Sequence, residues 1–139
     1  MSYHDTLTSR VLLAGEPAIG VVEITLPRAW DGPPLHHHDF DEVFHVVEGE
    51  LTFLLGDDVV TAGPGSTTVA PRGVHHTLAN VSDAPARYVL TCTPGGFERM
   101  FARLEAKAAG VEPSEEAMRP FPETTMVGPT IFAHLGRAA

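Results

Sequence analysis

The sequence has little of what exported, membrane-bound or disulfide-stabilised proteins depend on. Cys92 is the single cysteine among 139 residues, so an internal disulfide is excluded and the composition fits a reducing cytoplasm. The sequence has no run of 18 or more apolar residues, which a membrane-spanning helix would require. Residues 1–10 are polar and lack the apolar segment of a secretory signal. We therefore expect a cytoplasmic protein that makes no membrane contact.

Basic side chains are also scarce, since 9 Lys and Arg stand against 18 Asp and Glu and give a net charge of −9 at pH 7. This charge repels a phosphate backbone, and neither a basic run nor a helix-turn-helix pattern opposes it. These absences argue against nucleic-acid binding. What the chain does have is 43% apolar residues over a length that suits one core. We expect a single domain over residues 1–139.

Short segments rich in β-branched and aromatic residues fill most of the chain up to residue 93, and Gly, Pro and Asp separate them. The expected strands are 19–26, 43–47, 51–55, 59–61, 66–70, 75–80 and 86–93, with 11–14 as a first strand or an arm. Gly49 lies between 43–47 and 51–55, which we expect to form a hairpin. No helical pattern alternates with these strands, so the sequence predicts an all-β sandwich or barrel rather than a parallel α/β sheet.

The periodicity changes after residue 95. Apolar residues then recur at helical spacing and predict a C-terminal helix at about 96–109 that ends at Gly110. We expect this helix to pack on the barrel, with a lid or a dimer contact as the alternatives. Residues 111–139 have weak periodicity and either cross the barrel mouth or form a mobile tail, with one helical turn possible at 114–118.

Two histidine clusters flank the central strands. Side chains in an extended segment alternate between two faces, so His36 and His38 point the same way and can chelate one ion. In the second cluster His75 and His76 point to opposite faces. Glu42 follows a bend after His38 and can supply an anionic oxygen. We expect the two clusters to meet around one metal ion.

Imidazole and carboxylate ligands suit a divalent transition metal ion, such as Mn, Fe, Co, Ni, Cu or Zn, and the residues do not select among them. Three nitrogens and one oxygen leave coordination positions open on a six-coordinate ion. Such a site is open to a substrate and is suited to catalysis rather than only to structure.

The spacing of these residues resembles the two motifs of the cupin family, G-x5-H-x-H-x3,4-E-x6-G and G-x5-P-x-G-x2-H-x3-N. The second motif fits without a gap, and the first fits from its histidines onward, with Trp30 where its leading glycine is expected. The first motif's matching residues are His36, His38, Glu42 and Gly49. The second motif's matching residues are Gly65, Pro71, Gly73, His76 and Asn80.

The resemblance implies a cupin-type double-stranded β-helix, a jelly-roll barrel, with its core at about 19–93 and the metal inside. It assigns His36, His38, Glu42 and His76 as the metal ligands. Short flanking segments are most similar to small bacterial cupins of the quercetin dioxygenase-like group. The resemblance also implies a homodimer, and uncovered strand edges favour one.

The other candidate residues have structural interpretations. Strand alternation turns His37, His75 and His45 away from the ion, and Cys92 is expected to be a buried thiol. Asn80 is expected to form hydrogen bonds at a strand end rather than to bind metal. The apolar residues expected on the inward face, where they would line a dry pocket, are Phe44, Val46, Phe53 and Leu78.

The leading functional hypothesis is a metal-dependent, dioxygenase-like oxidoreductase that acts on a small aromatic or enol-type molecule. In this hypothesis Glu42 takes or returns a proton and is the catalytic residue. One alternative is an isomerase, decarboxylase or hydrolase that uses the ion as a Lewis acid. Another is a cupin that binds a small molecule without turnover, because this fold alone does not determine function.

Overall fold

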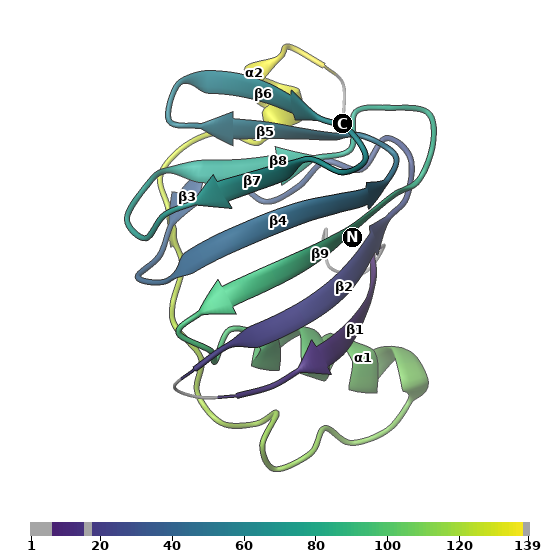
Figure 1. Ribbon diagram of the computed structural model, residues 1–139, viewed down its shortest axis with the longest axis vertical. Helices are drawn as coiled ribbons and strands as arrows, with labels where there is room; N and C mark the ends of the chain where they lie inside the picture. Colours follow the sequence, from purple (N-terminus) through teal and green to yellow (C-terminus); the bar gives the residue numbers. More distant parts are fainter. Residues whose placement is uncertain (1–6, 16–17, 138–139) are drawn as a thin grey trace.

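The computed structural model describes residues 7–15 and 18–137, which form two five-stranded antiparallel sheets and two helices (Figure 1). The first sheet has the strand order β1 (Thr8–Leu13), β2 (Gly20–Leu26), β9 (Ala86–Thr93), β4 (Asp41–Glu48) and β7 (Thr67–Ala70). The second sheet has the order β10 (Thr125–Met126), β3 (His36–His37), β8 (His76–Ala79), β5 (Leu51–Leu55) and β6 (Asp58–Ala62). The all-β jelly-roll prediction is confirmed.

The hydrophobic core lies between the two sheets. In β2 and β9 buried residues alternate with half-buried ones, as expected for strands with one face against a core. Phe44 of β4 and Phe53 of β5 are buried and meet edge to face, with ring centroids 5.1 Å apart. This contact joins one sheet to the other, and offset aromatic pairs of this kind add to the stabilisation from burial.

The expected hairpin between 43–47 and 51–55 is wrong. β4 pairs with β7 and β9 in the first sheet, whereas β5 pairs with β6 and β8 in the second. The chain therefore crosses between the sheets between Glu48 and Leu51 instead of turning back on itself. Gly49 at this crossover has a φ of 78°, in the left-handed region, and a Cβ there would collide with the carbonyl oxygen of Pro85.

The predicted helix is confirmed as α1 (Glu98–Ala109), which packs on β1 and β2 (Figure 1). Gly110 ends the helix in the left-handed conformation, and its backbone N–H donates to the carbonyl of Lys107. No helix in the described part of the chain is long and apolar enough to cross a membrane. Residues 1–6, part of the segment judged to lack a secretory signal, lie outside the described residues.

The segment after α1 crosses the barrel at the end where β3 lies. It forms a single turn at 114–118, joins the second sheet as β10 beside β3, and continues into α2 (Ile131–His134). α2 packs against β5 and β8 through the buried side chains of Ile131 and Phe132. Of the two alternatives for this segment, the structure therefore shows the chain crossing the barrel end.

Candidate metal centre

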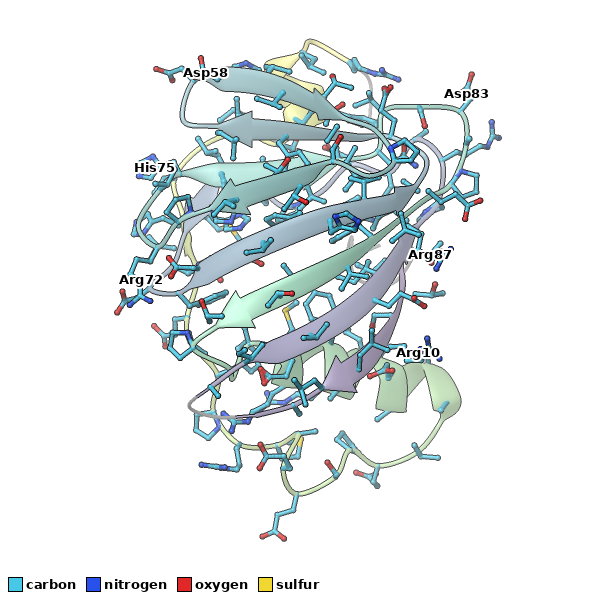
Figure 2. The ribbon with its side chains drawn as sticks, in the orientation of Figure 1. Arg10, Asp58, Arg72, His75, Asp83 and Arg87 are labelled. Atoms are coloured by element: carbon cyan, nitrogen blue, oxygen red, sulfur yellow. The ribbon has the colours of Figure 1, made fainter. Side chains whose placement is uncertain are left out.

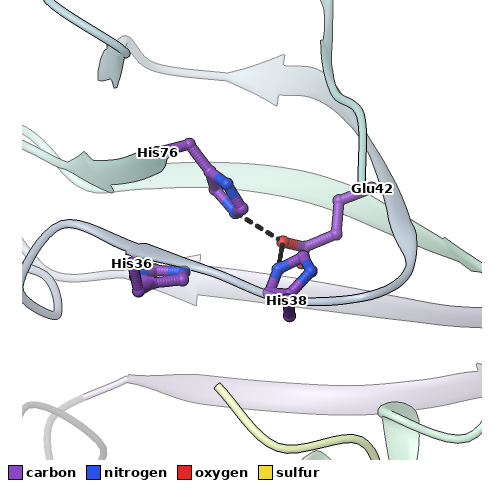
Figure 3. Close-up of side chains that lie close together, drawn as sticks. All are labelled: His36, His38, Glu42 and His76. Atoms are coloured by element: carbon purple, nitrogen blue, oxygen red, sulfur yellow. Dashed lines mark hydrogen bonds and ion pairs between the residues drawn. The ribbon is translucent and has the colours of Figure 1, made fainter. Parts of the chain in front are cut away.

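Four side chains that are distant in the sequence converge inside the barrel (Figure 3). They are His36 in β3, His38 in the following bend, Glu42 in β4 and His76 in β8. One potential ligand atom from each lies within 4.8 Å of the others, and every one of the four side chains is buried. These are the residues that the sequence assigns as the metal ligands.

Strand register explains this convergence. His36 and His76 are direct partners across the antiparallel β3–β8 pair, so their side chains project from the same face. Glu42 belongs to the other sheet, where it pairs with Cys92 of β9 on one side and Ala70 of β7 on the other. The carboxylate therefore approaches the histidines from the opposite wall of the barrel.

Backbone hydrogen bonds set the orientation of all three imidazole rings. Each Nδ1 lies at hydrogen-bond distance from a backbone carbonyl two residues away, to which it donates a proton. The pairs are His36 with Pro34 at 2.8 Å, His38 with Phe40 at 3.1 Å and His76 with Val74 at 2.9 Å. A proton on Nδ1 leaves Nε2 with its lone pair toward the cluster, as in histidines that bind metal ions through Nε2.

Glu42 contacts two of the rings directly. Its Oε1 lies 2.6 Å from Nε2 of His38 and 2.9 Å from Nε2 of His76 (Figure 3). Because Nδ1 of each ring already donates to a carbonyl, a second donor at Nε2 requires a charged imidazolium. A divalent cation held between these nitrogens and the carboxylate satisfies the same atoms without two extra protons. The donor set therefore fits a metal ion.

The pKa values of the cluster reflect burial and the contacts with Glu42. Burial raises the pKa of Glu42, but the hydrogen bonds from His38 and His76 outweigh it and hold the pKa at about 2. Burial lowers the pKa of His36 to about 4. His76 is also buried, yet its hydrogen bond to Glu42 raises its pKa above the usual value. At neutral pH Glu42 is an anion and His36 is neutral, which are the forms that bind metal.

The cluster forms one wall of a cavity of about 220 Å³. Phe44 and Leu78 line this cavity as the sequence predicts. The prediction is wrong for Val46 and Phe53, which are fully buried in the core and do not line it. Val46 follows Phe44 along the inward face of β4 and is farther from the ligand Glu42, so inward orientation alone does not bring a residue to the cavity.

Sequence reasoning missed much of the cavity wall. The residues it did not assign to the cavity include Trp30, Tyr88, Leu90, Phe97, Met100, Phe101, Phe121, Thr124 and Met126. The inward alternation of residues 86–93 could have identified Tyr88 and Leu90, because both share a face with Cys92. The residues from 97 onward carry no such signal, since their position depends on how the C-terminal segment crosses the barrel.

Two arginines of α1 hold that segment in place. Arg99 is 4% exposed, and its guanidinium donates to the carbonyl of Pro120 at 2.7 Å and to the carboxylate of Glu116 at 2.9 Å. The guanidinium of Arg103 lies over the ring of Phe121, 4.9 Å from its centroid. These contacts fix Phe121 as part of the cavity wall.

The remaining candidates lie away from the cluster. The rings of His37 and His75 stack on each other with centroids 5.2 Å apart, and Figure 2 shows His75 pointing away from the barrel. His45 is exposed, and its Nδ1 lies 3.0 Å from the hydroxyl of Thr67. Asn80 is buried and donates to two backbone carbonyls at the end of β8. None of these histidines belongs to the cluster.

Comparison with known proteins gives one family. The profile described as Cupin domain matches residues 22–92, which is half of the chain. No curated protein matches the sequence.

Several solved structures share the fold. KdgF from Halomonas sp. has a TM-score of 0.59 at 20% identity, over 64% of this chain and 79% of that one. A sugar phosphate isomerase of the cupin superfamily from Silicibacter pomeroyi has a TM-score of 0.58 at 26% identity, over 66% and 61%. The DMSP lyase DddQ from Ruegeria pomeroyi has a TM-score of 0.56 at 20% identity, over 63% and 47%.

Proposed function

Because this chain belongs to the cupin domain family, we propose that it is a metal-dependent, dioxygenase-like oxidoreductase that incorporates dioxygen into a small aromatic or enol-type molecule. The observation that carries the proposal is the position of the His36, His38, Glu42 and His76 cluster in the wall of an otherwise largely apolar cavity. A divalent transition metal ion held by these residues would act as a Lewis acid toward a substrate hydroxyl and supply the redox partner for dioxygen.

The cavity lining restricts the class of substrate. Among the residues that the structure describes, no Lys or Arg lines the cavity, and Glu42 is the single acidic lining residue. A phosphorylated or multiply charged substrate would lose its hydration there, with no described Lys or Arg to replace it. This argues against a substrate like that of the sugar phosphate isomerase from Silicibacter pomeroyi, although the fold is shared. Aromatic walls such as Phe44 and Phe97 favour a flat, weakly polar molecule.

The residues of the cluster have distinct roles in this proposal. His36, neutral at pH 7, and His76 would hold the ion, and their burial in the barrel keeps bulk water away from this centre. Glu42 would help to hold the ion as an anion, and its carboxylate is the group in the cluster that would take the proton of the substrate hydroxyl. With a pKa of about 2 in contact with His38 and His76, Glu42 is a weak base until that contact is broken. Both atoms of dioxygen enter the product, so the reaction requires no separate reductant.

Oxygen uptake tests the proposal. The protein is loaded separately with each candidate metal and supplied with quercetin, catechol and pentane-2,4-dione in an oxygen-electrode cell. We expect uptake with at least one pair of metal and substrate, and a decrease of about 100-fold or more in Glu42→Gln. Glu48→Gln, at the exposed end of the same strand, is the matched control and should keep full activity.

A strictly anaerobic arm separates the other hypotheses. Loss of substrate without oxygen would identify an isomerase, decarboxylase or hydrolase in place of an oxidoreductase. Binding with no turnover in either arm would identify a binding protein. The absence of uptake for every metal and substrate would contradict the proposal.

A further inference from the structure

The phenol of Tyr88 is a polar group on the otherwise apolar inward face of β9. The inward face of β9 consists of Ala86, Tyr88, Leu90 and Cys92, and Tyr88 is 4% exposed. Its phenol has no hydrogen-bond partner among the residues that the structure describes, although the ring lies 5.9 Å from that of Phe44. Tyr88 also lines the cavity that contains the metal cluster.

A buried hydroxyl without a partner is unfavourable. Leaving one unsatisfied costs about 1–3 kcal/mol, and most buried tyrosine hydroxyls in proteins are hydrogen-bonded. Phenylalanine would fill the same space on β9 without that cost. The phenol group therefore requires a partner that comes from the cavity rather than from the surrounding chain.

Position and protonation make Tyr88 a hydrogen-bond donor to the contents of the cavity. Along β9 it lies four residues from Cys92, the strand partner of Glu42, on the same inward face. Burial, and in second place the charge of Glu42, raises the pKa of its phenol well above the usual range. The hydroxyl therefore keeps its proton across the physiological pH range and donates rather than accepts a charge-assisted bond.

We infer that Tyr88 is a substrate-binding residue whose hydroxyl donates a hydrogen bond to an oxygen of the molecule held at the metal cluster. The inference rests on the proposed function, which it makes more specific. The ligand then carries two oxygens, one directed to the metal and one that accepts from Tyr88. Because neither Lys nor Arg lines the described part of the cavity, the second oxygen belongs to a neutral group such as a ketone, an ether or a hydroxyl.

A matched pair of probes tests this inference. 4-Hydroxyacetophenone and 4-ethylphenol have nearly the same shape and share a phenol oxygen, but the first alone has a ketone oxygen. Their affinities for the metal-loaded protein are measured by titration calorimetry without oxygen, for the wild type and for Tyr88→Phe. We expect Tyr88→Phe to weaken binding of the ketone about tenfold and to leave binding of 4-ethylphenol unchanged.

Two controls separate binding from a structural role. Thr52→Val deletes another buried hydroxyl, on β5, that does not line the cavity, so we expect it to change neither affinity. Thermal unfolding of the metal-free Tyr88→Phe protein should occur at or above the wild-type temperature, since no bond within the protein is lost. A decrease in that temperature of more than about 4 °C would show that the hydroxyl is structural and would overturn the inference.

The binding results distinguish the two claims. If Tyr88→Phe binds both probes as the wild type does, or weakens both equally, the inference about Tyr88 is overturned and the proposed function stands. If the metal-loaded wild type binds neither probe and consumes no oxygen with the substrates above, the proposed function is overturned and the inference is overturned with it.

Discussion

Two groups of histidines, adjacent in the sequence, have opposite environments in this protein. His36, His38 and His76 are buried and direct Nε2 toward a shared centre. His37 and His75 lie next to them in the chain, yet they stack on each other outside the cluster. Their chemistry is identical, and strand alternation alone sends one group inward and the other outward.

The comparison shows that burial gives these side chains their function. Burial lowers the pKa of His36 to about 4, while the contact with Glu42 raises the pKa of His76. An exposed imidazole is solvated, and its contacts with other side chains are weak because water competes for them. Arg99 and Arg119, which both bond to Glu116, show the same contrast between a buried and an exposed side chain. Substitutions can test this contrast in the histidines and in the arginines.

The largest effect is expected from deleting one histidine of each group. His76→Ala removes a candidate nitrogen ligand and leaves Glu42 buried with one ring contact fewer. We expect its affinity for the metal to fall by more than the 10- to 100-fold that is typical when a residue behind a ligand is replaced. His75→Ala should retain the wild-type metal content. Elemental analysis of the two purified variants after dialysis against a chelator measures this. Equal metal loss in both would contradict the assignment of the site.

A smaller effect is expected from the arginines. Arg99 is buried and bonds to Pro120 and Glu116, so Arg99→Met should lower the free energy of unfolding by about 1–3 kcal/mol. Arg119 also bonds to Glu116, but its side chain is 56% exposed, and Arg119→Met should change stability by less than about 0.5 kcal/mol. Urea unfolding of both variants provides the test, and similar losses in the two would contradict the contrast.

The smallest effect is a pH dependence of the metal-free protein. Between pH 6.5 and 4 the unfolded chain protonates His36 whereas the native state, with a pKa of about 4, does not. The unfolded state then binds more protons, so stability falls as the pH is lowered through this window. Comparison of His36→Gln with the wild type by urea unfolding should show that this variant lacks a contribution on the order of 1 kcal/mol.

The half-buried neighbour of His36 in β3 supplies a matched control substitution. His37→Gln makes the same substitution at a ring that packs against His75 rather than inside the barrel, and the slope of His36→Gln is compared with that of this variant. His76 contributes with the opposite sign, since its raised pKa stabilises the native state at low pH, and both variants retain it. A wild-type slope in His36→Gln would show that burial does not suppress the protonation of this ring.

Local rules predicted the cluster well. His36 and His38 are two residues apart in an extended segment, so their common face follows from the chain itself. The spacing around His76 matches a family motif, which assigned this residue rather than His75. Strand boundaries such as 86–93 follow from β-branched residues between turn signals, and the structure reproduces that strand.

The remaining features depend on contacts between distant segments. The position of Gly49 between two short strands predicts a hairpin, and only the structure shows that the backbone of Pro85 lies against this glycine. Nothing local to Phe121 shows that two arginines of α1 hold it at the cavity. Tyr88 lies on a face that alternation identifies, but only the structure shows that its hydroxyl has no hydrogen-bond partner among the described residues.

The path of the chain after β9 has a further consequence for how this protein can change. The four candidate metal ligands lie within residues 22–92, the part that matches the cupin family, whereas Phe97, Met100, Phe121 and Met126 line the cavity from outside that part. One part of the cavity wall is thus encoded apart from the candidate ligands, while Phe44, Leu78 and Tyr88 lie in the same part as they do. Substitutions after residue 93 can alter which molecule enters the cavity and leave the four-residue cluster intact. Proteins that share this cluster can therefore differ in substrate while they keep the same candidate metal site.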